Sequence, residues 1–169
     1  GYSTDNGLDW TSTIAIIPWT LYLFYGDDQA LRDCYENIRR YVDYVDNRFP
    51  QHLADWGRGD WVPVTVGSNK ELTSSVYFYT DARILANAAR LFGKTADAEH
   101  YGRLADDIRQ AINDRYLNRE TGIYASGTQT EQSVPLYWGV VPHECEALVA
   151  KRLNERVQAA DYHLDVGVL

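Results

Sequence analysis

The chain has no methionine, only two cysteines and no long hydrophobic run. Its longest apolar stretch, "IAIIPWTLYLFY", is shorter than the roughly 18 residues that a membrane span needs, and it contains a proline. No signal-peptide pattern is present either. Cys34 and Cys145 are far apart and have no motif spacing, so they indicate small core residues and give no support to a disulfide.

Basic residues are also scarce. Lys and Arg total 16 against 24 Asp and Glu, a net charge of −8, which argues against a nucleic-acid partner. There is no phosphate-binding glycine loop and no serine or cysteine nucleophile motif. Asp161, His163 and Asp165 alternate as metal ligands do, but the residues around them lack the context of a metal site. We therefore predict no metal and no cofactor.

The 169 residues fit one domain, and their patterning is helical. Three segments are apolar on all sides: 11–25, 71–92 and 131–141. An aromatic residue and a glycine suited to a helix C-cap lie at or near the end of each, at Gly26, Gly93 and Gly139. Pro18 and Pro135 predict that two of these helices are kinked or begin later.

An amphipathic helix follows each turn, with apolar residues at helical spacing on one face. These residues are Leu31, Tyr35, Ile38, Val42, Val45 and Phe49 in the first helix, Tyr101, Leu104, Ile108, Ile112 and Tyr116 in the second, and Cys145, Leu148, Val149, Leu153 and Val157 in the third, which opens with Pro142.

The pattern predicts an all-α fold of three helical hairpins. A helix that is apolar all round needs cover on several sides, so buried helices inside a ring of amphipathic ones give about half of an (α/α)6 toroid. A solenoid is the competing architecture, but its repeats are usually more uniform. Short strands are expected only at 61–66 and 122–125.

The return connections, around 50–69 and 117–130, are long, as functional loops often are. We expect both to lie at one rim of the toroid. The first contains "LADWGRGDWVPV", and the Asp-Trp pair recurs at Asp9-Trp10, Asp55-Trp56 and Asp60-Trp61. An indole can cover the C–H face of a sugar while a carboxylate accepts hydrogen bonds from its hydroxyls. The alternative, in which the indoles close the rim of the core, is equally compatible with the pattern.

Two other features have simple explanations. Arg58-Gly59-Asp60 matches the integrin-binding tripeptide, but so short a match occurs often by chance. Glu131, between Gln129 and Gln132, could face a central cavity, although a first-turn carboxylate that complements the helix dipole explains it better.

The chain resembles the catalytic domain of bacterial α-L-rhamnosidases of glycoside hydrolase family 78. The resemblance rests mainly on "DWTSTIAIIPWTLYLFYGDDQAL" and "GRGDWVP", and continues through "YENIRRYVDYV", "YFYTDARILANAARLFGKTADAEHYGRLADDI", "TQTEQSVPLYWGVVPHE" and "HLDVGVL". It covers residues 1–169, which are expected to be part of an (α/α)6 catalytic domain.

That resemblance implies an inverting hydrolase that releases terminal α-L-rhamnose from glycosides or polysaccharides. In the family the acid and base motifs lie before and after the matched region, so no catalytic residue is assigned here. Trp10 and Trp61 match tryptophans that line the rhamnose subsite, and Asp60 is their neighbour. "TST" after Trp10 replaces a Gly-Asp found in many relatives, which leaves the substrate range open.

Two alternatives stay open: a toroid glycosidase for another sugar or uronic acid, and a non-catalytic carbohydrate-binding or helical module. The expected partner is a carbohydrate. The expected compartment is periplasmic or extracellular, with the cytoplasm as the alternative.

Overall fold

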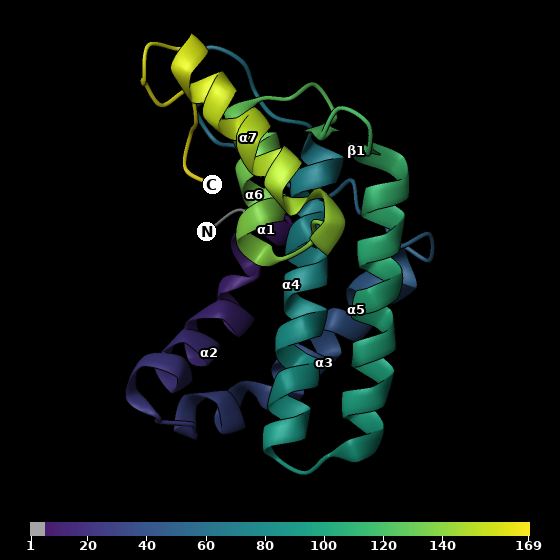
Figure 1. Ribbon diagram of the computed structural model, residues 1–169. Coiled ribbons are helices and arrows are strands. Elements are labelled where there is room, and N and C mark those ends of the chain that lie inside the picture. The colour runs from purple at the N-terminus through teal and green to yellow at the C-terminus, as the bar shows by residue number, and fades with distance from the viewer. Residues whose placement is uncertain (1–5) are drawn as a thin grey trace.

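The computed structural model describes residues 6–169 as a helical protein (Figure 1). Its helices are α1 (Leu8–Thr11), α2 (Thr13–Tyr25), α3 (Gln29–Arg48), α4 (Lys70–Leu91), α5 (Thr95–Tyr116), α6 (Gln129–Trp138) and α7 (His143–Ala159). Two short strands, β1 (Leu117–Asn118) and β2 (Ile123–Tyr124), pair antiparallel. The all-α prediction is confirmed.

The helices form three hairpins, α2–α3, α4–α5 and α6–α7, as predicted. In Figure 1, α4 runs down the middle, α5 stands beside it, and α2 and α7 extend away from it at the lower left and upper left. Helix α4 contacts α1, α2, α3, α5 and α6, so every other part of the core is built around it.

Helix α4 is buried on nearly every side. Its side chains are mostly small or apolar, and even its buried polar residues Thr73, Ser74, Ser75 and Thr80 are compact. Small side chains let neighbouring helices approach closely while larger ones, such as Phe78 and Leu85, fill the gaps between them. This confirms the prediction of an inner helix.

The amphipathic helices turn their predicted faces inward. The apolar residues of α3 from Leu31 to Val45 are buried, as are those of α5 from Tyr101 to Ile112. In α7 only Cys145 and Val149 are fully buried. Both cysteines are free thiols: Cys145 is buried and Cys34 half-buried.

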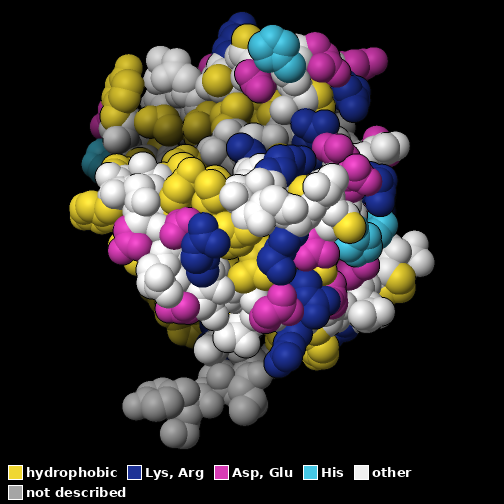
Figure 2. All heavy atoms as spheres, turned by 90° about the horizontal axis from the view of Figure 1, so that it is seen from below, with side chains coloured by type: hydrophobic (Ala, Val, Ile, Leu, Met, Phe, Trp, Pro, Cys, Tyr) yellow, Lys and Arg dark blue, Asp and Glu magenta, His cyan; other side chains and the backbone are white. Residues whose placement is uncertain are grey.

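Helix α2 differs from α4, because much of its apolar surface faces solvent. Ala15 and Pro18 are its buried residues, whereas Ile17 and Leu23 are exposed and Phe24 is 79% exposed. Figure 2, seen from below, shows hydrophobic side chains gathered mainly on the left and charged ones mainly on the right. A helix apolar all round therefore lacks cover on one side, as expected for half of a toroid.

The helix ends also follow from the sequence, with small differences. Gly26 and Gly139 are left-handed C-caps, and Gly93 has a positive φ one residue after the C-cap of α4. Pro142 is the N-cap of α7, one residue earlier than predicted. Helices α2 and α6 continue through Pro18 and Pro135, so neither begins after its proline.

One predicted strand is wrong and one is confirmed. Residues 61–66 form bends without strand pairing, whereas Ile123–Tyr124 pair with Leu117–Asn118. The first segment contains Pro63, which lacks an N–H, and its alternating valines Val62 and Val64 are exposed rather than packed. Within residues 6–169 no helix is long and apolar enough to cross a membrane.

Gly26 gives a direct test of the first hairpin turn. Its φ is 67°, and a Cβ added there would meet nothing within 4 Å, so any penalty is conformational. We expect Gly26→Ala to lower the free energy of unfolding by about 1–2 kcal/mol in urea titrations. Gly26→Asn should cost less, because asparagine tolerates the left-handed region. Equal losses for the two variants would contradict this explanation.

Candidate functional site

The two long return loops converge on one end of the molecule. Residues 49–69 lead from α3 into α4, and residues 117–128 lead from α5 into α6. Both α4 and α6 begin toward the upper end of Figure 1, whereas the short turn between α4 and α5 lies at the lower end. The prediction that the loops share one rim is confirmed, and this rim carries the Asp-Trp pairs.

Asp9, on α1, fastens the first loop to the helices. Its buried carboxylate accepts hydrogen bonds from the backbone amides of Arg58 (3.2 Å) and Gly59 (2.7 Å). Burial raises the pKa of Asp9, and these backbone hydrogen bonds act in the opposite direction. Nearby, the Leu8 amide donates to the Trp56 carbonyl at 2.8 Å, so α1 and the loop are joined at two points.

Gly57 makes this close approach sterically feasible. A Cβ at that position would lie 2.1 Å from Ser74 Oγ and 2.6 Å from the Asp9 carboxylate. Any side chain would therefore push the loop away from α1 and α4. Gly57 thus permits the close approach of the loop backbone to α1 and α4.

Asp60 connects the loop to two distant segments. Its carboxylate, in a residue only 6% exposed, accepts hydrogen bonds from the Thr130 hydroxyl on α6 and from the amides of Gly167 (2.8 Å) and Leu169 (3.2 Å). Asp60 thus ties the first loop, the start of α6 and the C-terminal segment together.

The indoles of Trp10 and Trp61 are the accessible ones in these pairs. Trp10 is 38% exposed and Trp61 is 45% exposed. The Arg58 guanidinium lies 5.2 Å from the centre of the Trp61 ring, within cation–π range. Because Asp9 holds the loop against α1, the segments that carry the two indoles are fixed to each other.

Trp56 has a different position. Its ring meets Tyr44 edge to face at 5.9 Å, and the Arg48 guanidinium lies 4.6 Å from its centre. Both partners belong to α3, so Trp56 closes the rim of the core. Trp56 thus fits the explanation in which an indole closes the rim of the core, whereas Trp10 and Trp61 are accessible.

Glu131 is a structural carboxylate. It forms a capping box with Thr128 and also accepts hydrogen bonds from the amides of Asn69 (2.8 Å) and Ser126 (3.1 Å). This confirms the helix-start explanation. The Gln132 side chain forms hydrogen bonds with the backbone of Gly122 and Tyr124. The Gln129 side chain does the same with the backbone of His163 and Asp165. Both side-chain amides are therefore used within the protein.

The geometry bears on two minor hypotheses. In Arg58-Gly59-Asp60, the glycine and the aspartate are buried, so the tripeptide is not a protruding adhesion tip. Asp165 accepts hydrogen bonds from Thr65, and no group of three or more His, Cys, Asp or Glu side chains within residues 6–169 is arranged to hold a metal.

An aromatic hollow beside Asp60 was not predicted from the sequence. It measures about 330 Å³ and is lined by Tyr77, Ser133, Val134, Tyr137, Trp138 and Leu169. Tyr77 and Trp138 meet edge to face at 6.0 Å. Burial raises the pKa of Tyr77, and the charges of Asp9, Asp81 and Asp60 raise it further. Because these aromatics lie within inner-helix patterns, the sequence alone made them look like core residues.

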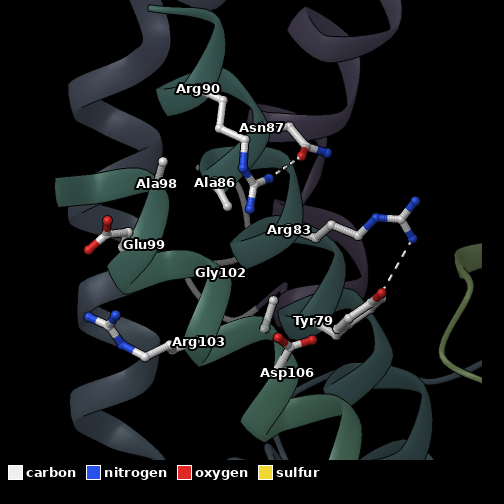
Figure 3. A pocket seen from close by; sticks show the side chains of 11 residues that line it. Tyr79, Arg83, Ala86, Asn87, Arg90, Ala98, Glu99, Gly102, Arg103 and Asp106 are labelled. Carbon is white, nitrogen blue, oxygen red and sulfur yellow. Dashed lines mark hydrogen bonds between the residues drawn. The ribbon is translucent and has the colours of Figure 1, made fainter. Parts of the chain in front are cut away.

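A second hollow, of about 440 Å³, lies between α4 and α5 (Figure 3). Arginines and acidic residues share its walls, and Arg83 extends to hydrogen-bond with Tyr79 and with the Trp138 carbonyl. None of the Asp-Trp residues lines it. The rim, with its exposed indoles, is therefore the candidate site.

Comparison with known proteins gives the family. The family described as the bacterial alpha-L-rhamnosidase 6 hairpin glycosidase domain matches residues 1–169. The chain belongs to this rhamnosidase family. Its three hairpins are thus hairpins of a six-hairpin glycosidase fold.

Individual proteins similar to this chain are α-L-rhamnosidases as well. An α-L-rhamnosidase of Streptomyces avermitilis is 32% identical over 162 residues, covering 95% of this chain and 15% of the relative. A crystal structure of a Streptomyces avermitilis α-L-rhamnosidase complexed with L-rhamnose superposes with a TM-score of 0.88 at 30% identity, covering 94% of this chain and 15% of that one. For the α-L-rhamnosidase of Dictyoglumus thermophilum the TM-score is 0.87 at 35% identity, with coverages of 96% and 19%. The chain thus spans less than a fifth of the length of each of these relatives.

Asp9 provides a test of how the rim is held. Asp9→Asn replaces one acceptor oxygen by an N–H donor that would face a backbone N–H. We expect it to cost about 1–3 kcal/mol of stability and to speed hydrogen exchange at the Arg58 and Gly59 amides. Asp55→Asn is the matched control, because Asp55 is exposed and should change neither quantity. Unchanged exchange in Asp9→Asn would show that the loop does not depend on this carboxylate.

Proposed function

We propose that this chain is part of the catalytic domain of an inverting glycoside hydrolase that releases terminal α-L-rhamnose, and that it supplies the sugar-binding wall. Trp10 and Trp61 form the wall, and Asp60 is their polar companion. The observation that carries the proposal is the pair of accessible indoles, held on segments fastened together by Asp9.

The chemistry of the wall suits a deoxysugar. Rhamnose has a methyl group and an apolar C–H face, and a rigid indole covers such a surface with little loss of conformational freedom. Arg58 above the Trp61 ring helps to fix the orientation of that indole. The hollow lined by Tyr77, Trp138 and Leu169 extends apolar surface next to Asp60.

Asp60 combines an anchoring role with the proposed binding role. An ionised carboxylate has about four acceptor positions, and three donors from the protein occupy three of them. We assign the one remaining position, on a residue only 6% exposed, to a sugar hydroxyl. The donors of Thr130 and the C-terminal segment also hold the carboxylate in one orientation, which reduces the entropy lost on binding.

We place neither the catalytic acid nor the base on this chain. Inverting hydrolysis needs two carboxyl groups roughly 6.5–9.5 Å apart with water between one of them and the sugar. The buried carboxylates Asp9, Asp60 and Glu131 are already committed to protein hydrogen bonds. Asp81 is entirely buried. The acid and base are therefore assigned to other parts of the polypeptide, and the uncovered face of α2 to contacts with further hairpins.

Sugar selectivity tests the proposal directly. We expect calorimetric titration of L-rhamnose into the complete polypeptide that carries this sequence to show saturable binding, with no heat from D-glucose at the same concentration. The difference should arise because D-glucose carries a hydroxymethyl group in place of the methyl group and also differs from L-rhamnose in the configuration of C3, C4 and C5. Absence of a rhamnose signal, or equal signals from both sugars, would reject the rhamnose assignment.

The two tryptophans of the loop should behave differently. We expect Trp61→Ala to reduce kcat/KM for an aryl α-L-rhamnoside by about 10- to 100-fold, the effect of losing roughly 1.4–2.7 kcal/mol of contact. Trp56→Phe is the control: it keeps an aromatic ring beside Tyr44 and Arg48 and should leave the kinetics unchanged. Equal effects of the two changes would remove Trp61 from the binding wall.

A further inference from the structure

Asp81 is a carboxyl group in the core that the proposed function does not use. It lies on α4 with no solvent exposure, opposite Ser12 at the corner between α1 and α2. Ser12 Oγ is 2.6 Å from Asp81 Oδ2 and 2.7 Å from the Leu8 carbonyl oxygen. The other carboxyl oxygen, Oδ1, is buried and has no hydrogen-bond partner among the described residues.

The number of protons decides how these two contacts are made. A serine hydroxyl carries one hydrogen and can donate one hydrogen bond. The Leu8 carbonyl has no hydrogen to give, so the contact at 2.7 Å uses the Ser12 hydrogen. The contact at 2.6 Å then needs a hydrogen from the Asp81 side, because two oxygens at that distance without a proton between them repel each other.

The surroundings of Asp81 offer no positive charge. Among residues 6–169 no Lys, Arg or His forms an ion pair with it, whether from α1, α2, α3, α5 or α6. Two tyrosines respond to its ionisation, Tyr41 on α3 and Tyr77 on α4: burial raises their pKa values first, and Asp81 raises them further once it ionises at high pH. The Tyr41 hydroxyl is buried near Thr11 and Ser12, whose hydroxyls act to lower its pKa.

Three buried carboxylates at the rim accept backbone hydrogen bonds of a kind that Asp81, in the core, does not receive from the described residues. Asp9, Asp60 and Glu131 each accept hydrogen bonds from at least two backbone amides. Within residues 6–169, Asp81 accepts no hydrogen bond from a backbone amide. Burial accordingly raises the pKa of Asp81 well above its usual value.

We propose that Asp81 is a neutral carboxylic acid in the folded protein, and that it donates its proton to Ser12 and thereby positions the corner that carries Trp10. The hydrogen-bond chain runs from Asp81 to Ser12 to the Leu8 carbonyl, so it joins α4 to the turn that contains Asp9 and Trp10. Asp81 is a positioning residue, and only its link to the sugar wall rests on the proposed function.

Infrared spectroscopy of the complete polypeptide reports the protonation state directly. At pH 7 we expect a C=O band of a protonated carboxylic acid that is absent from Asp81→Asn. The band should remain in Asp60→Asn, since Asp60 already receives three hydrogen bonds. In Ser12→Ala it should remain but move to higher frequency, because the acid loses its acceptor. A spectrum in which Asp81→Asn removes only carboxylate bands would overturn the proposal.

The pH dependence of stability provides a second test. A folded-state pKa above the unfolded value means that the contribution of Asp81 is complete below the unfolded pKa and is lost as pH rises towards the folded pKa. Relative to Asp81→Asn, the folding equilibrium constant of the wild type should fall about tenfold for each pH unit above about 4, until the folded pKa is reached. A flat or rising difference would contradict a neutral Asp81.

The link to the sugar wall has its own measurement. Asp81→Ala should weaken L-rhamnose binding, and Asp81→Asn should restore it, because the Asn amide can donate to Ser12. If Asp81→Ala binds rhamnose as the wild type does, Asp81 does not position the wall. If neither the wild type nor any variant binds rhamnose, the proposed function is wrong. The infrared measurement still decides the protonation state of Asp81 in that case.

Discussion

Hydrogen bonds from backbone amides to buried carboxylates hold the rim and its long loops together. Asp9 receives the amides of the first return loop, Asp60 those of the C-terminal segment, and Glu131 those of the residues before α4 and α6. A charged acceptor makes each bond stronger than a neutral one, and burial shields it from water. Loops that contain few apolar anchors can therefore keep a fixed shape.

The helical core places these carboxylates. Helix α4 is covered on most sides and contacts five other helices, so it sets the position of each hairpin. Its N-terminus meets the return loops, and its middle holds the Asp81–Ser12 contact. Carboxylates that accept backbone amides thus lie around the N-terminal end of α4, whereas Asp81, in its middle, accepts no backbone amide from residues 6–169.

Much of the fold could be predicted from the sequence because it depends on local periodicity. The spacing of Leu31 to Val45 and the glycines after the inner helices specify helices, faces and turns. The partners of Asp60 could not be predicted, since Thr130 and Gly167 are 70 and 107 residues away. The same limit explains why Trp56 and Trp61 looked alike in sequence: only contacts from α3 distinguish them.

The connections of the hairpins differ sharply between the two ends of the molecule. At one end, turns of a few residues with left-handed glycines join the helices, as at Gly26 and Gly139. At the other, the chain passes through residues 49–69 and 117–128 before the next inner helix starts. An insertion at the short turns would disturb helix packing, whereas the long loops can change length and composition where no buried carboxylate or close glycine contact ties them to the helices. If the rim binds sugar as proposed, changes in sugar specificity are expected among the long loops, whereas the short turns at the opposite end are constrained mainly by helix packing.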